Sequence, residues 1–430
     1  MRRTILTVLT VLAIQSVAGQ NYDDYFEDKT LRLDYVFAGD SVNQEIYFNE
    51  AYSTPTWAGR RHNLSEPLLR GNGEIVLKEA STGKIIYSNS FSSLFQEWQS
   101  TEEATKVRKC FEMCMQVPFP KAPVEITVNL RDIHAKVSST ISHVIDPKDI
   151  LIRPITSDNK YKYTLKSGDC KNCIDIAILA EGYSQADQEK FYADAQRATD
   201  AITGHEPFKS MKDKINIVAV GSVSSQSGVS VPHEGKWVNT NSRTHYDTFY
   251  SNRYLTTSDM RRIYDQLACV PFEHIIVLIN TPNYGGGGIY NEVMFSSSDH
   301  ATFRQVLVHE FGHSFGGLGD EYYYDDQYSS MYPSDTEPWE PNLTTLVDFD
   351  SKWKDMLPKG TKIPTEPDKR KKNTDVNKLT QKVGVYEGGG YQSKGVYRPV
   401  QECRMKINEV EHFCPVCSRA IKRMIEYYTE

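Results

Sequence analysis

The first third of the chain alternates between hydrophobic and polar residues with a period of two. Residues 124–130 (VEITVNL) show this alternation, which is typical of a strand with one buried face. Two further hydrophobic runs, at 75–77 and 84–87, flank the turn sequence STG at 81–83, and this arrangement predicts a β-hairpin. From about Thr30 to Ile155 the pattern therefore predicts an all-β domain that resembles a small sandwich.

Beyond Ile155 hydrophobic runs alternate with amphipathic segments. The runs predict strands at 174–179, 215–220 and 275–279, and the segments predict helices from Ser184 to about Thr203 and from 258 to 267. Ser184 and Asp187 have the spacing of a helix cap. Strands that alternate with helices in this way favour a mixed α/β sheet.

Glycine and helix signals follow. The glycine run at 285–288 is expected to break the chain before residues 289–295, an expected edge strand or loop. Residues 301–315 have the length and composition of a helix, and another helix is expected over 417–428. The whole pattern predicts a multidomain α+β protein. Its N-terminal β-sandwich-like accessory domain would span 20–155 and an α/β domain would span 156–430.

The composition is that of a folded protein whose length suits two or three domains. Of 430 residues, 39% are hydrophobic and 24% are charged, which excludes a largely disordered chain. The 49 Lys and Arg against 56 Asp and Glu leave a net charge of −7. Because a negative protein repels phosphate backbones, we expect no nucleic-acid partner. We also expect no transmembrane segment, and the sequence makes no prediction about the oligomeric state.

The first residues, 1–19, have the order of a secretory signal peptide. Two arginines precede a hydrophobic run at 5–14, and the small residues Ala18 and Gly19 come before a polar stretch. Removal of this leader also removes the two arginines, so the net charge becomes −9. We therefore expect an exported protein, located in the periplasm or secreted to the extracellular medium.

The chain has eight cysteines, at positions 110, 114, 170, 173, 269, 403, 414 and 417. An even number in an exported chain favours structural disulfides, although spacing does not specify the pairing. Two C-x-x-C pairs suggest a zinc ribbon instead, but Cys173 and Cys414 lie 241 positions apart, far beyond the usual ribbon spacing. Thioredoxin-like redox chemistry is a third interpretation. Disulfides are the expectation.

The expected helix over 301–315 carries the motif HEFGH at 309–313. Residues four apart lie on one helical face, so His309 and His313 can bind one zinc ion while Glu310 lies beside a zinc-bound water. Zinc lowers the pKa of such a water to about 7, and a carboxylate can accept its proton as the water attacks a carbonyl. The motif therefore predicts hydrolysis of peptide bonds with Glu310 as general base.

The residues after the motif support this interpretation. Gly316 stands where a left-handed residue can end the helix and turn the chain back toward the metal. Asp320 and Glu321 then bring carboxylates to the region where a third ligand is needed. Together with Asp325 and Asp326 they could bind a structural Ca²⁺ ion, although the spacing lacks the pattern of an EF-hand.

The sequence HEFGHSFGGLGDEY at 309–322 resembles the signature of the IgA-peptidase-type zinc metallopeptidase family, whose members are relatives of the metzincins. The similarity extends to LAEGY at 179–183, YRP at 397–399 and CRM at 403–405, so it covers most of the chain beyond Ile155. The N-terminal β region resembles the accessory domain of such peptidases less specifically. The resemblance implies a secreted zinc endopeptidase with a metzincin-like α/β catalytic domain.

One departure from the metzincin pattern concerns the third zinc ligand. Metzincins place that ligand six residues after the second histidine, where this chain has Gly319. The ligand must therefore come from a neighbouring position. Asp320 is the nearest and is favoured, whereas Glu321 is the alternative because its side chain is longer. The expected zinc ligands are His309, His313 and Asp320.

The resemblance also implies two supporting residues. Met405 would lie in a turn beneath the metal, with an ordinary core methionine as the alternative. A disulfide from Cys403 to Cys414 or Cys417 could hold that turn. A tyrosine often helps to stabilise the oxyanion in related enzymes, and the candidates here are Tyr322, Tyr323, Tyr391 and Tyr397. Tyr397 is favoured as a catalytic residue because it falls in the similar stretch before Met405.

The predicted function is that of an exported zinc endopeptidase acting on a protein or peptide substrate. The resemblance offers host glycoproteins such as immunoglobulin A as one substrate class, and an edge strand near 289–295 could pair with an extended substrate. One alternative is a glycan- or protein-binding surface module with a structural metal site. Another is a zinc amidase for a non-protein substrate. Glu310 favours catalysis over the first alternative, because a structural site needs no base beside an open coordination position.

Overall fold

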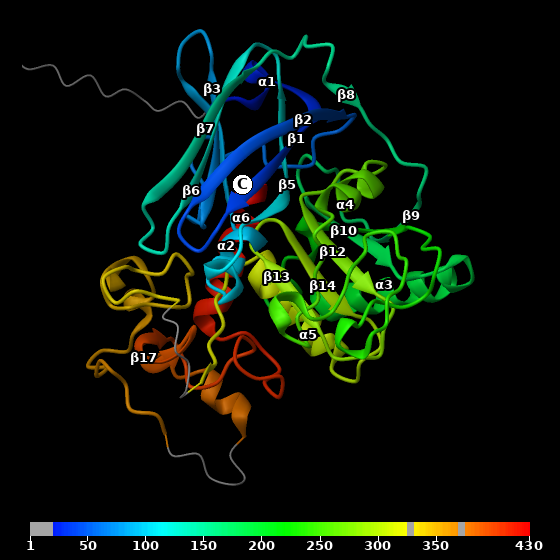
Figure 1. The fold of residues 1–430 in the computed structure, drawn as a ribbon. Coiled ribbons are helices and arrows are strands. Elements are labelled where there is room, and N and C mark those ends of the chain that lie inside the picture. Colours follow the sequence, from blue (N-terminus) through cyan, green and yellow to red (C-terminus); the bar gives the residue numbers. More distant parts are fainter. Residues whose placement is uncertain (1–19, 325–330, 369–374) are drawn as a thin grey trace, which may run out of the picture.

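The structure, a computed structural model, describes residues 20–324, 331–368 and 375–430. The expected signal peptide and the pair Asp325 and Asp326 lie outside these residues. The blue and cyan N-terminal strands occupy the top of Figure 1, the green α/β part lies at the lower right, and the orange C-terminal segments lie at the lower left, from where the red end of the chain reaches the centre. The prediction of a mixed α and β protein with an N-terminal domain is confirmed.

The N-terminal domain consists of two sheets that enclose one hydrophobic core. The first sheet has the order β5-β1-β2-β8 and contains β1 (Phe26–Gly39), β2 (Gln44–Thr54), β5 (Lys109–Pro120) and β8 (Arg153–Pro154). The second has the order β4-β3-β6-β7 and contains β3 (Gly73–Glu79), β4 (Ile85–Phe91), β6 (Val124–Arg131) and β7 (Val137–Ile145). Two short helices, α1 (Tyr22–Tyr25) and α2 (Leu94–Trp98), accompany these sheets.

The period-two pattern explains how the two sheets pack. Val124, Ile126, Val128 and Leu130 are all at most 1% exposed, whereas the residues between them are half-buried. They pack against β1 residues of the opposite sheet, such as Leu33. Strands β3 and β4 pair antiparallel, so the predicted hairpin is confirmed.

A six-stranded sheet forms the centre of the second part of the chain. Its order is β13-β14-β12-β10-β11-β9, with β9 (Lys160–Leu165), β10 (Ile174–Glu181), β11 (Ile215–Gly221), β12 (His274–Ile279), β13 (Gly286–Ile289) and β14 (Val293–Ser297). The four inner strands pair parallel, and the edge strands β9 and β13 pair antiparallel. The strands predicted at 174–179, 215–220 and 275–279 are confirmed as β10, β11 and β12.

Helices cover both faces of this sheet. They are α3 (Gln188–Thr203), α4 (Met260–Leu267) and α5 (Phe303–Ser314). Ile176 and Ile178 of β10 belong to a core shared with α3 and α5, whereas Ala177 and Leu179 belong to a core shared with α4. Because both faces are covered, β10 is hydrophobic almost throughout rather than alternating. The predicted helices 184–203, 258–267 and 301–315 are confirmed.

The glycine run and the segment after it differ from the expectation. Gly286–Ile289 forms the edge strand β13, and Val293–Ser297, part of the expected edge region, is the inner strand β14. The glycine run led to the wrong expectation because glycine usually interrupts strands. Here the glycines of β13 allow helix α5 to approach the strand closely, as described below.

The C-terminal part packs against the same core. It contains the small sheet β15 (Tyr323–Tyr324), β16 (Tyr386–Gly389) and β17 (Tyr391–Arg398), followed by α6 (Pro415–Thr429). Helix α6 confirms the expected final helix and buries Ile421 and Ile425 against the six-stranded sheet. Short 3₁₀ helices join the main elements: η1 (Glu103–Thr105), η2 (Gln185–Asp187), η3 (Lys212–Lys214), η4 (Pro232–Glu234), η5 (Thr248–Tyr250), η6 (Phe349–Ser351), η7 (Lys354–Met356) and η8 (Val376–Thr380).

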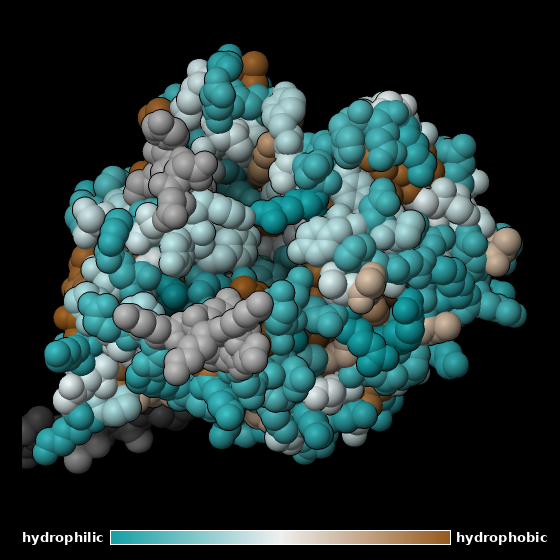
Figure 2. Space-filling view, turned by 90° about the horizontal axis from the view of Figure 1, so that it is seen from below, coloured by the Kyte–Doolittle hydropathy of each residue, from teal (hydrophilic) through white to brown (hydrophobic). Residues whose placement is uncertain are grey.

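Surface and helix properties agree with the hydropathy of the sequence. The face seen from below is mostly hydrophilic, with hydrophobic residues scattered over it (Figure 2). None of the helices in the described ranges combines the length and the apolar character needed to cross a bilayer.

A buried glutamate between β13 and β14 makes stability depend on pH. Glu292 is 4% exposed and its Oε2 atom forms no hydrogen bond with the described residues. Burial raises its pKa from 4.5 to about 8. Between these values the unfolded chain has lost the proton that the folded protein keeps, so stability falls as pH rises.

We expect Glu292→Gln to remove this dependence, because the neutral amide has no proton to lose. Thermal unfolding should show that wild-type protein loses about 3 kcal/mol of stability between pH 5 and pH 8 through this group, and that the variant loses much less. Parallel pH profiles of the two proteins would contradict the assignment.

Candidate active site and metal centre

Helix α5 places both motif histidines on one face. His309 and His313 lie one turn apart, and their Nε2 atoms are 3.1 Å from each other. The Nδ1 atom of His309 lies 3.0 Å from the carbonyl oxygen of Arg404, and that of His313 lies 2.5 Å from the carbonyl oxygen of Leu318. Because a carbonyl only accepts hydrogen bonds, each Nδ1 carries a proton, so in the neutral imidazole each Nε2 presents a lone pair to the cluster.

Asp320 completes the cluster. Its Oδ1 lies 3.1 Å from His309 Nε2 and 3.3 Å from His313 Nε2. Asp320 is 6% exposed, and Oδ1 forms no hydrogen bond with the described residues. Two imidazole nitrogens and one carboxylate oxygen therefore converge on one point, where a metal cation held by all three would balance the buried charge of Asp320. The donor set fits the metal that the motif predicts.

The turn that brings Asp320 back differs in one residue from the expectation. The left-handed residue is Gly317, with φ of 61°, and not Gly316. Helical backbone continues through Phe315, so the chain reverses one residue later than predicted. The amide of Gly317 donates to the carbonyl of His313 at 3.0 Å, which ties the turn to the second histidine.

Glu321 points away from this cluster. Its Oε1 accepts a hydrogen bond from Asn342 Nδ2 at 3.0 Å, and the same amide nitrogen donates to the carbonyl of Gly319 at 2.9 Å. Asp320 and Glu321 therefore belong to two different groups of potential metal ligands. The structure brings Asp320, and not Glu321, to the histidines, and the two carboxylates do not share one site as the Ca²⁺ alternative required.

Met405 lies beneath the histidines. It is fully buried, and its Sδ lies 2.7 Å from the position that a Cβ on Gly312 would occupy. Only a glycine leaves room for this sulfur between the two histidines of α5. The carbonyl of Met405 also accepts a hydrogen bond from the amide of Glu321 at 2.8 Å, so the turn at 403–406 supports both α5 and the Asp320 segment.

Glu310 faces the edge of the six-stranded sheet. Its Oε1 lies 3.0 Å from the position of a Cβ on Gly286, and its carbonyl oxygen lies 2.5 Å from that of a Cβ on Gly288. Any side chain at Gly288 would collide with α5, so the glycine run allows helix and strand to approach closely. Burial raises the pKa of Glu310, and its side chain lines the active-site cleft.

This cleft lies between the two parts of the chain and has a volume of about 1040 Å³. His309, His313, Asp320 and Glu310 line it together with β13. The N-terminal domain contributes Glu97 from α2, which accepts a hydrogen bond from Tyr254 at 2.5 Å and whose pKa burial raises to about 7. The sequence indicated no site residue in this domain, because no local pattern shows that α2 and β13 line the same cleft.

The tyrosine that contacts the candidate metal ligands is Tyr391, and not the predicted Tyr397. The hydroxyl of Tyr391 donates to Oδ2 of Asp320. Tyr397 packs against the hydrophobic core, and it is not among the described residues that line the cleft. Tyr391 has a φ of 66° at the start of β17, a conformation that L residues rarely adopt and that surrounding contacts must hold. That backbone geometry has no signal in the sequence.

We expect Tyr391→Phe to weaken metal binding about 10- to 100-fold, because the variant loses the hydrogen bond that orients Asp320. Titration with a competing chelator measures the affinity, and Tyr397→Phe is the matched control. An unchanged affinity for Tyr391→Phe, or an equal loss for Tyr397→Phe, would contradict this role.

The expected disulfides are not present. All eight cysteines lie in the described residues, and each is a free thiol. Sulfur atoms Sγ of Cys403 and Cys417 are 3.9 Å apart, whereas a disulfide requires about 2.05 Å. The even number of cysteines and the expected export favoured pairing, but three of the thiols instead surround the carboxylate of Glu321.

Comparison with known families defines the class of protein. The family described as IgA Peptidase M64 matches residues 163–378 and 369–425, and the family described as Peptidase M64 N-terminus matches residues 21–142. The protein is therefore a peptidase. It belongs to the IgA peptidase M64 family, as the motifs predicted, and the cluster on α5 is a candidate site for the metal of a metallopeptidase. No curated protein matches the chain.

Proposed function

We propose that this protein is an exported, zinc-dependent endopeptidase of metzincin type. The observation that carries the proposal is the convergence of His309, His313 and Asp320 beside Glu310 in a cleft. Two imidazoles and one carboxylate are a usual ligand set for catalytic zinc. The order of residues 1–19, which is typical of a secretory signal peptide, supports export.

The residues of the cleft have distinct roles in this proposal. His309 and His313 present Nε2 atoms to the ion, and Asp320 presents Oδ1. A zinc ion held there would act as a Lewis acid that polarises the scissile carbonyl and lowers the pKa of water. Glu310 accepts the proton of the attacking water and then gives it to the leaving amine. Its buried position and raised pKa suit both halves of this transfer.

The edge strand β13 provides a surface for the substrate. Gly286–Ile289 lines the cleft next to Glu310. Gly286 is already bridged to Tyr254 on its outer side, so the edge beyond Gly286 is the part that can pair with an extended peptide. Strand pairing recognises the main chain rather than particular side chains, so it suits an endopeptidase that acts within a protein. Immunoglobulin A, which the family description names, is the first folded substrate to test.

The proposal predicts loss of activity on removal of the metal. Purified protein should cleave an unfolded protein substrate, a chelator should abolish the cleavage, and stoichiometric zinc should restore it. Mass spectrometry of the products distinguishes internal cuts from removal of terminal residues. Absence of cleavage by zinc-loaded protein, over a broad peptide library and with immunoglobulin A, would contradict the proposal.

A further inference from the structure

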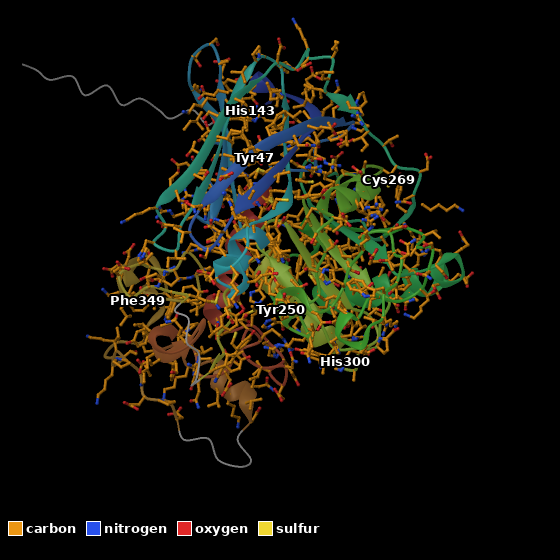
Figure 3. All side chains as sticks on the ribbon, in the orientation of Figure 1. Tyr47, His143, Tyr250, Cys269, His300 and Phe349 are labelled. Carbon is orange, nitrogen blue, oxygen red and sulfur yellow. The ribbon has the colours of Figure 1, made fainter. Side chains whose placement is uncertain are left out.

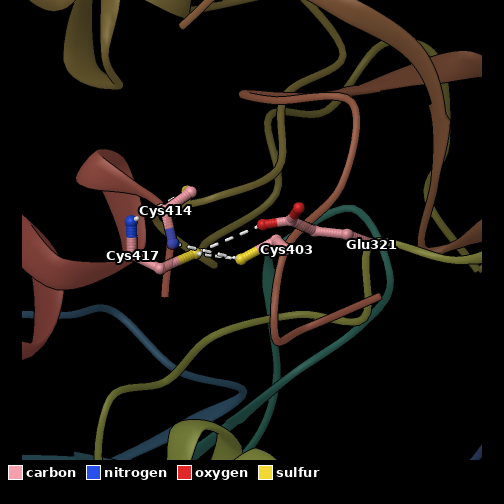
Figure 4. Close-up of side chains that lie close together, drawn as sticks. All are labelled: Glu321, Cys403, Cys414 and Cys417. Carbon is pink, nitrogen blue, oxygen red and sulfur yellow. Dashed lines mark hydrogen bonds between the residues drawn. The ribbon is translucent and has the colours of Figure 1, made fainter. Parts of the chain in front are cut away.

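A second group of potential metal ligands lies behind the candidate active site. Glu321, Cys403, Cys414 and Cys417 are all completely buried, and their ligand atoms lie within 4.8 Å of one another. Figure 4 shows the three cysteine residues and the carboxylate of Glu321 gathered at one point, with Cys414 and Cys417 at the start of α6. The peptidase mechanism proposed above does not use this group.

We propose that this group binds a structural zinc ion. The distance of 3.9 Å between Sγ of Cys403 and Sγ of Cys417 supports this, because a tetrahedral ion with sulfur ligands at about 2.3 Å holds them about 3.8 Å apart. Zinc prefers thiolates, and a closed set of four protein ligands is typical of structural rather than catalytic sites.

The carboxylate of Glu321 needs a partner at this place. Its Oε2 is buried and forms no hydrogen bond with the described residues, and Oε1 lies 3.2 Å from Sγ of Cys417. A disulfide between two of the cysteines would leave that oxygen and one thiol unsatisfied in the core. A bound ion accounts for all four ligands, and its binding would release the three thiol protons to solvent.

The backbone around the cysteines is arranged to favour thiolates. The amide of Cys414 lies 3.3 Å from Sγ of Cys403, and the amide of Cys417 lies 3.5 Å from Sγ of Cys414. Cys414 is the N-cap of the 15-residue helix α6, whose dipole favours negative charge at that end. Arg398, which is 3% exposed and attracts Glu321, offsets part of the net negative charge.

The ion would join the chain segments that hold the active site. Glu321 follows Asp320 directly. Cys403 precedes Arg404, whose carbonyl contacts His309, and Met405, which underlies α5. A zinc ion here would fasten this turn and the Asp320 segment to α6, so it would support the catalytic centre without contacting the substrate.

The test separates this ion from the catalytic one. In a His309→Ala/His313→Ala double variant the catalytic ligands are missing, so we expect the purified protein to retain one zinc ion per chain. X-ray absorption at the zinc edge should then show sulfur neighbours at about 2.3 Å. A double variant without zinc, or with only nitrogen and oxygen neighbours, would overturn the proposal whether or not the protein is a peptidase.

Single cysteine variants provide the matched comparison. Cys414→Ser, made in the double variant, should lose the remaining ion, whereas Cys269→Ser should keep it, because Cys269 lies beyond α4 and outside the cluster (Figure 3). Mass spectrometry of alkylated, denatured wild-type protein should find Cys403, Cys414 and Cys417 reduced. A disulfide between any two of them would overturn the proposal, and this result does not depend on how well the variants fold.

Discussion

Glu310→Gln is expected to lower kcat/KM for peptide hydrolysis by about 10²- to 10⁴-fold, because the amide cannot accept the proton of the attacking water. The variant should keep its metal, since Glu310 is not one of the three residues whose ligand atoms converge. It should also fold, because glutamine has the same shape and fits beneath β13. Initial rates on a fluorogenic peptide, together with zinc analysis of the same preparation, measure both effects.

The matched control is Glu292→Gln, which makes the same change in another buried glutamate that does not line the cleft. It should retain activity close to wild type at a pH where both proteins are folded. If Glu310→Gln kept full activity with its metal bound, a different group would have to act as the base. The general-base assignment would then be wrong.

Asp320→Ala is expected to weaken binding of the catalytic ion by more than about 100-fold and to reduce activity in proportion. The variant keeps both histidines but loses the only carboxylate of the cluster. Competition with a chelator of known affinity measures the change. An ion that binds only the folded protein also raises its melting temperature, so added zinc should stabilise wild-type protein more than the variant.

The exposed Asp350, which forms an ion pair with Lys354 on the surface, provides the control. Asp350→Ala should leave both metal affinity and activity unchanged, because both side chains of the pair are largely exposed and neither belongs to a group of potential ligands. Unchanged metal binding in Asp320→Ala would show that another residue supplies the third ligand.

Features that depend on neighbours in the sequence were predictable. The spacing of His309 and His313 follows from helical geometry, so the sequence specified that these two side chains share one face of the helix. Glu310 occupies the position directly after His309. The strands β6 and β10 were recognisable because burial on one face or on both faces leaves different hydrophobic patterns. The family resemblance also implied that Met405 lies below the motif helix, and the structure packs Met405 against Gly312 of α5.

Other features depended on how distant segments meet. Asp320 and Glu321 are adjacent in sequence, yet one faces the histidines and the other faces three cysteines. Judged by residue type alone, either carboxylate could have been the third ligand. The choice between Tyr391 and Tyr397 depended on a left-handed residue at the start of β17, and the eight cysteines carried no signal of which thiols would meet.

The sequence by itself therefore determined the class of protein and the group of residues at its candidate site, because one turn of helix is enough to place two imidazoles and a carboxylate together. Only tertiary packing decided which carboxylate completes the cluster, which tyrosine orients it, and that Glu97 of the N-terminal domain reaches the cleft. The physical reason is that helical neighbours are set by local hydrogen bonds. Contacts between segments that lie up to hundreds of residues apart are set by the shape of the whole core.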